Sequence, residues 1–69
     1  MFKKFILVSI DNNNNENTVF SSSNYHEVYE LAVTLSQVAT LNHFEVRDKH
    51  NRVINRFRRK EDWNTLTNI

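Results

Sequence analysis

The residues of this chain that could do chemistry do not form a catalytic pattern. Its histidines fall in a predicted helix start, a strand start and a turn, and no two have the spacing that lets two imidazoles bind one metal ion: His26, His43 and His50. Glu27 and Glu30 are three residues apart on a predicted helix, as an acid–base pair could be. A solvated helix face explains this pair better. We therefore predict no metal site and no catalytic residue.

The residue types that are missing exclude further chemistry. The chain has 69 residues and contains no cysteine, glycine or proline. Without cysteine there are no disulfides and no thiol catalysis, and without glycine there is no glycine-rich phosphate loop. A chain of this length buries only about 60% of the surface that it exposes when unfolded. We predict a protein without cofactor or enzymatic activity, whose fold is completed by a partner or by a second copy.

The charges are distributed unevenly along the chain. From Asp11 to Glu45 there are five acidic residues and no lysine or arginine, whereas 47–60 contains seven basic residues and one acid. Such a basic segment suits an acidic protein surface or a nucleic acid. The net charge of only +1 disfavours nucleic acid, because that affinity scales with the phosphates neutralised. The candidate partner-binding residues are Arg47, Arg52, Ile54, Arg56, Arg58, Arg59, Lys60 and Trp63.

Hydrophobic periodicity predicts the elements that must position these residues. Residues 2–10 read as a strand that is apolar on both faces, 11–17 as a loop, and 18–21 as a short return strand. A helix is expected from Asn24, its N-cap, to about residue 40, with Glu27 completing a capping box and Asn42 as a left-handed cap. Its apolar stripe is Val28, Leu31, Ala32, Leu35, Val38 and Ala39.

Residues 43–47 and 52–58 are expected to form a second hairpin, for which two registers are open. A two-residue turn at His50 and Asn51 pairs Phe44 with Phe57 and gives the better cross-strand partners. A four-residue turn from Asp48 to Asn51 has the better turn chemistry and pairs Val46 with Ile54. We favour the first register, which turns Phe44, Val46, Val53 and Phe57 inward and puts Arg47, Arg52, Arg56 and Arg58 on the outer face.

These elements predict an α+β fold in the order β-β-α-β-β, with one helix packed on a small antiparallel sheet. Residues 1–69 are expected to form a single domain, with 60–69 as a short terminal helix or a tail. If Ile6, Val8 and Ile10 face the helix, Phe5 and Leu7 lie on the other face of the sheet. Phe5 and Leu7 are then the candidate face for a homodimer.

The first residues do not read as a targeting segment. The apolar run after Lys4 is about six residues long, whereas a secretory signal needs roughly 7–15 and a membrane span needs about 20. We expect a cytoplasmic protein that does not bind membranes.

The layout resembles that of small single-domain proteins encoded by phages and mobile elements, some anti-CRISPR and other anti-defence inhibitors among them. The resemblance lies in size and in the packing of one helix on a short antiparallel sheet. It implies a small inhibitor or regulator that acts by binding another protein, here through the Arg-rich hairpin and exposed aromatic residues. The alternative is a DNA- or RNA-binding module that uses the basic hairpin 47–60.

Overall fold

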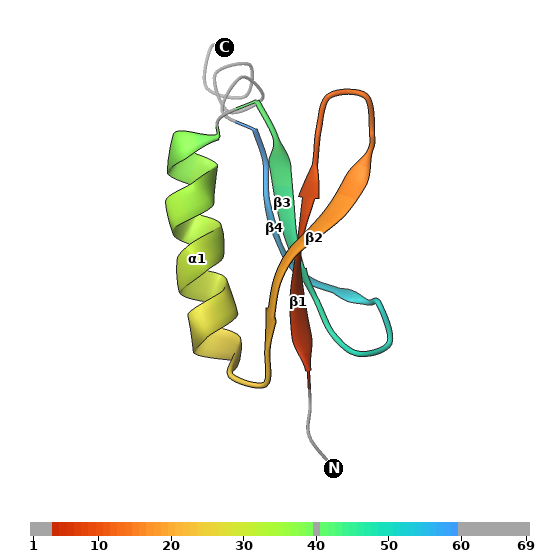
Figure 1. The fold of residues 1–69 in the computed structure, drawn as a ribbon, viewed down its shortest axis with the longest axis vertical. Coiled ribbons are helices and arrows are strands. Elements are labelled where there is room, and N and C mark those ends of the chain that lie inside the picture. Colours follow the sequence, from red (N-terminus) through yellow and green to blue (C-terminus); the bar gives the residue numbers. More distant parts are fainter. Residues whose placement is uncertain (1–3, 40, 60–69) are drawn as a thin grey trace, which may run out of the picture.

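The computed structural model describes residues 4–39 and 41–59, and it has the expected α+β fold (Figure 1). The elements, in chain order, are β1 (Phe5–Ile10), β2 (Glu16–Ser22), α1 (Tyr25–Val38), β3 (His43–Arg47) and β4 (Val53–Phe57). The strands form one antiparallel sheet in the order β2-β1-β3-β4. The predicted tail and its Lys60 and Trp63 lie outside the described residues.

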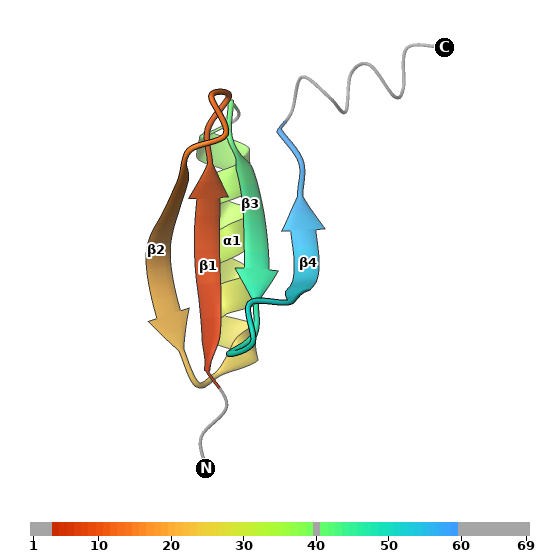
Figure 2. The same ribbon diagram turned by 90° about the vertical axis from the view of Figure 1, so that its right-hand side faces the viewer.

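Helix α1 covers the middle of one face of the sheet. Figure 2 shows it behind β1 and β3, while β4 stands at the outer edge. In the described part of the chain no helix is long and apolar enough to cross a membrane.

The core lies between α1 and the two central strands. Leu7 pairs with both Phe20 and Val46, and these side chains pack beneath Val28 and Ala32 of the helix. The predicted helix stripe is confirmed except at Val38, which is 75% exposed.

The prediction that Phe5 and Leu7 lie on the face away from the helix is wrong. Leu7 has no exposed surface, and Phe5 packs against the same core. The reason is pairing parity: β3 turns Phe44 and Val46 inward, and Val46 lies opposite Leu7, so the odd-numbered residues of β1 also face inward. Phe5 and Leu7 therefore do not form an exposed dimer face.

A chain of aromatic contacts holds β4 to the helix. The ring of Phe5 meets Tyr25 edge-on with 5.4 Å between centroids. Tyr29 lies 5.9 Å from Tyr25 and 5.6 Å from Phe57. Such pairs stabilise beyond their buried area, and they give the edge strand β4 a fixed position. Tyr29, which lies outside the predicted apolar stripe, is thus part of the packing.

The start of α1 follows the prediction in part. Asn24 is the N-cap, and its side chain accepts a hydrogen bond from the backbone amide of His26 at 3.0 Å. Glu27 does not close a capping box; its carboxylate accepts a hydrogen bond from the hydroxyl of Ser22 at 2.6 Å. At the other end the helix finishes at Val38, and Asn42 is not a left-handed cap, since among the described residues only Asn14 and Asn51 have positive φ.

Both hairpins close with the same loop. Asp11 Oδ1 accepts hydrogen bonds from the amides of Asn13 and Asn15, at 2.9 and 3.0 Å. In the second loop Asp48 Oδ1 accepts from His50 and Arg52, at 2.8 and 3.0 Å.

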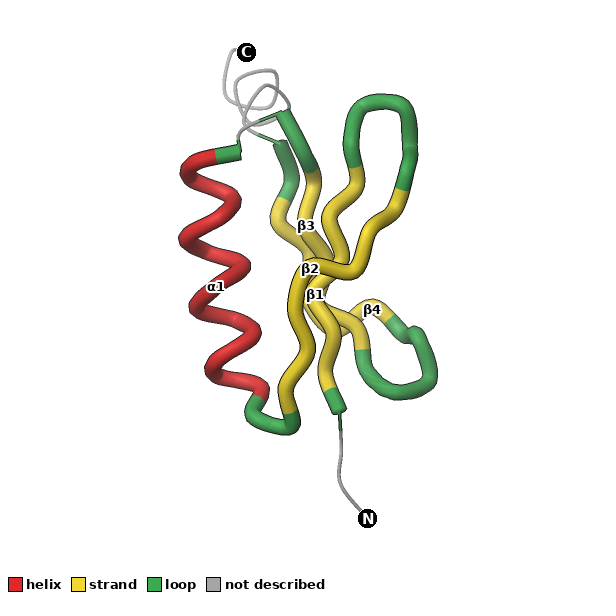
Figure 3. Tube along the Cα trace, in the orientation of Figure 1, coloured by secondary structure: helices red, strands yellow, loops and turns green. Residues whose placement is uncertain are grey.

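In each loop an asparagine takes the left-handed conformation that glycine usually fills, with φ of 65° at Asn14 and 64° at Asn51. Figure 3 shows the two loops at opposite ends of the sheet, both on the side away from α1.

The second hairpin combines the two predicted registers. Phe44 pairs with Phe57 and Val46 with Asn55, as the favoured register predicts. The turn nevertheless runs from Asp48 to Asn51, as in the other alternative. A bulge that leaves out Ile54 reconciles the two.

Candidate functional site

The outer face of the sheet carries a chain of alternating charges. The carboxylate of Glu45 accepts hydrogen bonds from Arg47 through one oxygen, at 2.6 and 2.9 Å, and from Arg56 through the other, at 2.9 Å. Arg47 also binds both carboxylate oxygens of Glu16, each at 3.1 Å. The result is a network across three strands, in the order Arg56–Glu45–Arg47–Glu16.

The middle of this network is buried although it lies on an open face. The side chains of Glu45 and Arg47 are only 6% and 11% exposed, whereas Arg56 and Glu16 are about half exposed. On β1, Ile6 pairs with Arg47 and Ile10 pairs with Glu16, and Val8 lies between these two positions. The ion pair between Arg47 and Glu16 therefore crosses β1 over Val8. Val8 is accordingly 3% exposed. The ion pairs thus cover the face of β1 that is turned away from α1.

The network shifts the protonation equilibria of two of its members. Hydrogen bonds from Arg47 hold the pKa of the Glu16 carboxyl below its usual value. Hydrogen bonds to Glu16 and Glu45 raise the pKa of the Arg47 guanidinium. Both shifts favour the charged forms, as expected for a structural ion pair.

Two of the predicted partner-binding arginines are therefore occupied within the fold. Arg47 is 9% exposed and is not available to a partner, which corrects its predicted place on a free outer face. Arg56 keeps an exposed portion while it binds Glu45. No local sequence pattern indicates this pairing, since Glu16 lies 31 residues before Arg47.

The remaining predicted residues lie along β4 and the strand ends. Ile54 is 45% exposed, as is its neighbour Val53, which was expected to point inward. Arg58 is exposed, and the backbone amide of Arg59 donates to His43 Nδ1 at 3.1 Å. Arg52 is exposed and binds Asp48 at 2.9 Å.

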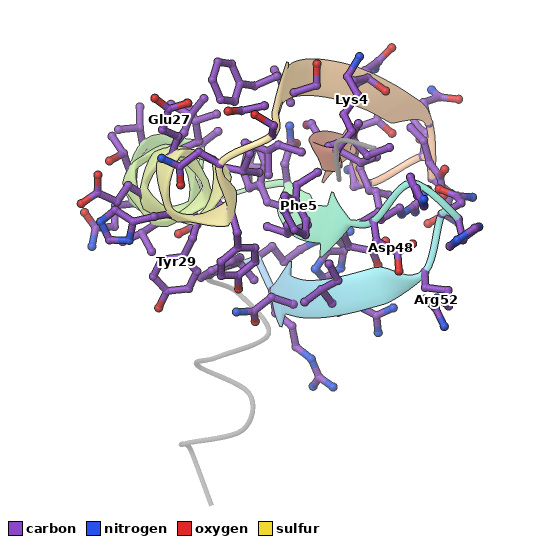
Figure 4. The ribbon with its side chains drawn as sticks, turned by 90° about the horizontal axis from the view of Figure 1, so that it is seen from below. Lys4, Phe5, Glu27, Tyr29, Asp48 and Arg52 are labelled. Atoms are coloured by element: carbon purple, nitrogen blue, oxygen red, sulfur yellow. The ribbon has the colours of Figure 1, made fainter. Side chains whose placement is uncertain are left out.

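Three cationic residues and a histidine gather at the lower end of the molecule, where the β3–β4 loop passes the start of β1. Lys4, Lys49, His50 and Arg52 line one hollow there together with Asp48 and two apolar side chains, Phe5 and Ile54. Figure 4 views this end: Asp48 and Arg52 lie together beside the loop, and Phe5 lies between them and α1. Lys4 was not among the predicted residues; only the fold brings it to the loop.

Potential metal-ligating side chains are scattered within residues 4–39 and 41–59. The histidine, aspartate and glutamate side chains described there form no group of three or more that could hold a metal ion. His26 forms an ion pair with Glu30 on the helix surface, with 3.2 Å between Nε2 and the carboxylate.

Comparison with protein-family models, with curated protein sequences and with solved structures gives no match to this chain. The geometry of its own residues therefore carries the functional argument.

Proposed function

We propose that this chain is a small protein-binding regulator that docks through the side chains of β4. The observation that supports this is the pair of exposed apolar residues Val53 and Ile54 on an edge strand, each 45% exposed. Arginines flank them in sequence: Arg52, Arg56 and Arg58. Apolar and arginine side chains together are the usual composition of binding hot spots.

The partner surface should be acidic with an apolar centre. The β4 edge carries exposed arginine charge, so an acidic partner would be attracted and a second basic edge repelled. Simple strand addition is disfavoured, because the backbone amide of Arg56 already bonds Asn55 Oδ1 at 2.9 Å and a bulge interrupts the strand at Ile54. Side chains, rather than backbone, make the contact in this proposal.

As a finer proposal, binding inhibits the partner and takes place in the cytoplasm, as in the small inhibitors that the chain resembles in layout. The alternative, nucleic-acid binding through the hairpin, has fewer free cations than the sequence suggests, because Glu45 binds Arg47 and Arg56. That loss weakens a mode whose affinity depends on the number of phosphate contacts.

The test is an affinity pull-down from host lysate with and without nuclease, using the wild type, Ile54→Asp and Val19→Asp. Val19 is the matched control, because the β1–β2 bulge leaves it out of pairing in the same way and it is 48% exposed. We expect a partner protein whose capture survives nuclease treatment. Its capture should be lost with I54D and retained with V19D. Equal capture by both variants would contradict docking through β4, and capture that disappears with nuclease would favour the nucleic-acid alternative.

A further inference from the structure

The hollow beside the β3–β4 loop has the size of a small-molecule site. Its volume is about 370 Å³, and ligand pockets usually measure roughly 300–1,000 Å³. Its walls come from two places distant in sequence, the start of β1 with Lys4 and Phe5, and residues 48–54.

The charges in the hollow favour a doubly negative ligand. Lys4 and Lys49 are exposed and form no ion pair with any residue of the described chain. With Arg52 and Asp48 they give a net charge of +2 when His50 is neutral. One carboxylate group would leave half of this charge uncompensated, whereas a phosphate monoester carries about −1.5 to −2 at pH 7.

The acid in the hollow is already satisfied. Asp48 Oδ1 accepts from two backbone amides of its own loop, and Oδ2 accepts from Arg52 Nε at 2.9 Å. These bonds hold the pKa of the Asp48 carboxyl below its usual value, the amide of Arg52 having the largest effect. The carboxylate thus stabilises the loop, and the two lysines are left to attract an anion.

The first hairpin shows that this loop geometry forms without cations. In the β1–β2 loop the same bonding pattern is made by asparagines, and Asn15 Nδ2 donates to Asp11 Oδ2 where Arg52 Nε donates to Asp48. The corresponding residues, Asn12 and Asn13 in one loop and Lys49 and His50 in the other, are exposed in both. The cations of the second loop are therefore in excess of what its geometry requires.

We propose that this hollow binds a small organic phosphate monoester. The phosphate group lies between Lys4 and Lys49, and the apolar part of the ligand lies against Phe5 and Ile54. The hollow shares Arg52 and Ile54 with the proposed docking surface, whereas Lys4 and Lys49 belong to the hollow alone. Variants of the two lysines therefore test this site separately from protein docking.

The test is calorimetric titration of the full chain with phenyl phosphate at low salt. We expect saturable binding that weakens about tenfold with Lys4→Gln and again with Lys49→Gln, because each variant removes one charged contact to the phosphate. Arg58→Gln makes the same change of charge outside the hollow and should leave the affinity unaltered. Circular dichroism checks that each variant is folded.

A second series separates the apolar contact from simple charge attraction. Ile54→Ser should weaken the binding of phenyl phosphate but not the binding of inorganic phosphate. The proposal is overturned if wild type shows no saturable binding, if inorganic phosphate binds as tightly as phenyl phosphate, or if K4Q and K49Q bind like R58Q. The pull-down with K4Q/K49Q stays independent, since those variants keep the β4 side chains intact.

Discussion

The β1–β2 and β3–β4 hairpins are built alike and carry different side chains. In each, an aspartate accepts two backbone hydrogen bonds from its loop, and an asparagine three residues later has positive φ. In each, a bulge in the second strand leaves one β-branched residue half exposed, Val19 or Ile54. The second hairpin alone surrounds this residue with cations.

This difference separates what the backbone requires from what it leaves open. The loop geometry needs the aspartate and the left-handed asparagine, which occur in both hairpins. Lys49, His50 and Arg52 stand where the first hairpin has asparagines, so the loop geometry does not explain the charges of Lys49 and Arg52. Our functional proposals therefore concern the second hairpin, and the first serves as an internal control.

The largest expected effect tests the network that joins the hairpins. Glu45→Gln removes the carboxylate between Arg47 and Arg56. Of the two acidic partners of the buried Arg47 guanidinium, Glu45 and Glu16, the variant keeps only Glu16. Breaking a buried ion pair costs about 3–5 kcal/mol, and we expect the lower part of this range for the free energy of unfolding. Urea denaturation measures it. Glu30→Gln on the exposed helix face is the control, and an equal effect of both variants would contradict a structural network.

Removal of the loop aspartates should affect both hairpins similarly. Asp11→Ala and Asp48→Ala each delete the acceptor for two backbone amides, so each should lower the thermal unfolding midpoint by a few degrees. Differential scanning calorimetry provides the comparison. A large effect at Asp48 with none at Asp11 would show that the loops are not equivalent.

The same carboxylates predict how stability depends on pH. Hydrogen bonds from the loop amides, first that of Asn15 for Asp11 and that of Arg52 for Asp48, hold both pKa values below their usual level. A lowered pKa stabilises the folded state above the pKa of the unfolded chain, about 3.9 for aspartate, and this contribution is lost as pH falls through the folded value. Unfolding followed from pH 6 to pH 2 should show stability falling below about pH 4. The decline should be smaller in the Asp11→Asn/Asp48→Asn variant, and an identical decline would contradict the assignment.

The left-handed asparagines should give a smaller and unequal effect. Alanine in this conformation costs about 1 kcal/mol, so Asn14→Ala and Asn51→Ala should both destabilise. Asn51→Ala should cost more, because Asn51 Oδ1 also accepts from Arg47 at 3.2 Å. Chemical denaturation of the two variants side by side measures the difference, and an equal cost would show that the hydrogen bond from Arg47 to Asn51 contributes nothing to stability.

The sequence predicted those parts of the fold that depend on local pattern. The helix stripe, its cap at Asn24 and the pairing of Phe44 with Phe57 all follow from periodicity and neighbouring residues. The orientation of β1 could not be predicted, because both of its alternate sets are apolar, and the choice is made by pairing of Leu7 with Val46. The two hairpin registers exclude each other in regular strands, and the bulge at Ile54 allows the features of both.

The candidate site was less predictable for the same reason. Composition points to an arginine-rich hairpin, but the burial of Arg47 depends on Glu16, a partner far away in sequence. Lys4 reaches the hollow only because β1 begins beside the β3–β4 loop. These are tertiary contacts that no local pattern encodes.

The most direct test of the comparison transplants the first loop into the second. The variant Lys49→Asn/His50→Asn/Arg52→Asn gives 48–52 the same sequence as 11–15, because Asp48 and Asn51 already match Asp11 and Asn14. If backbone geometry depends only on the shared aspartate and asparagine, its free energy of unfolding in urea should stay within about 0.5 kcal/mol of wild type, as for ordinary surface substitutions. A loss of more than about 1.5 kcal/mol would show that the cations hold the loop together and are not free for binding.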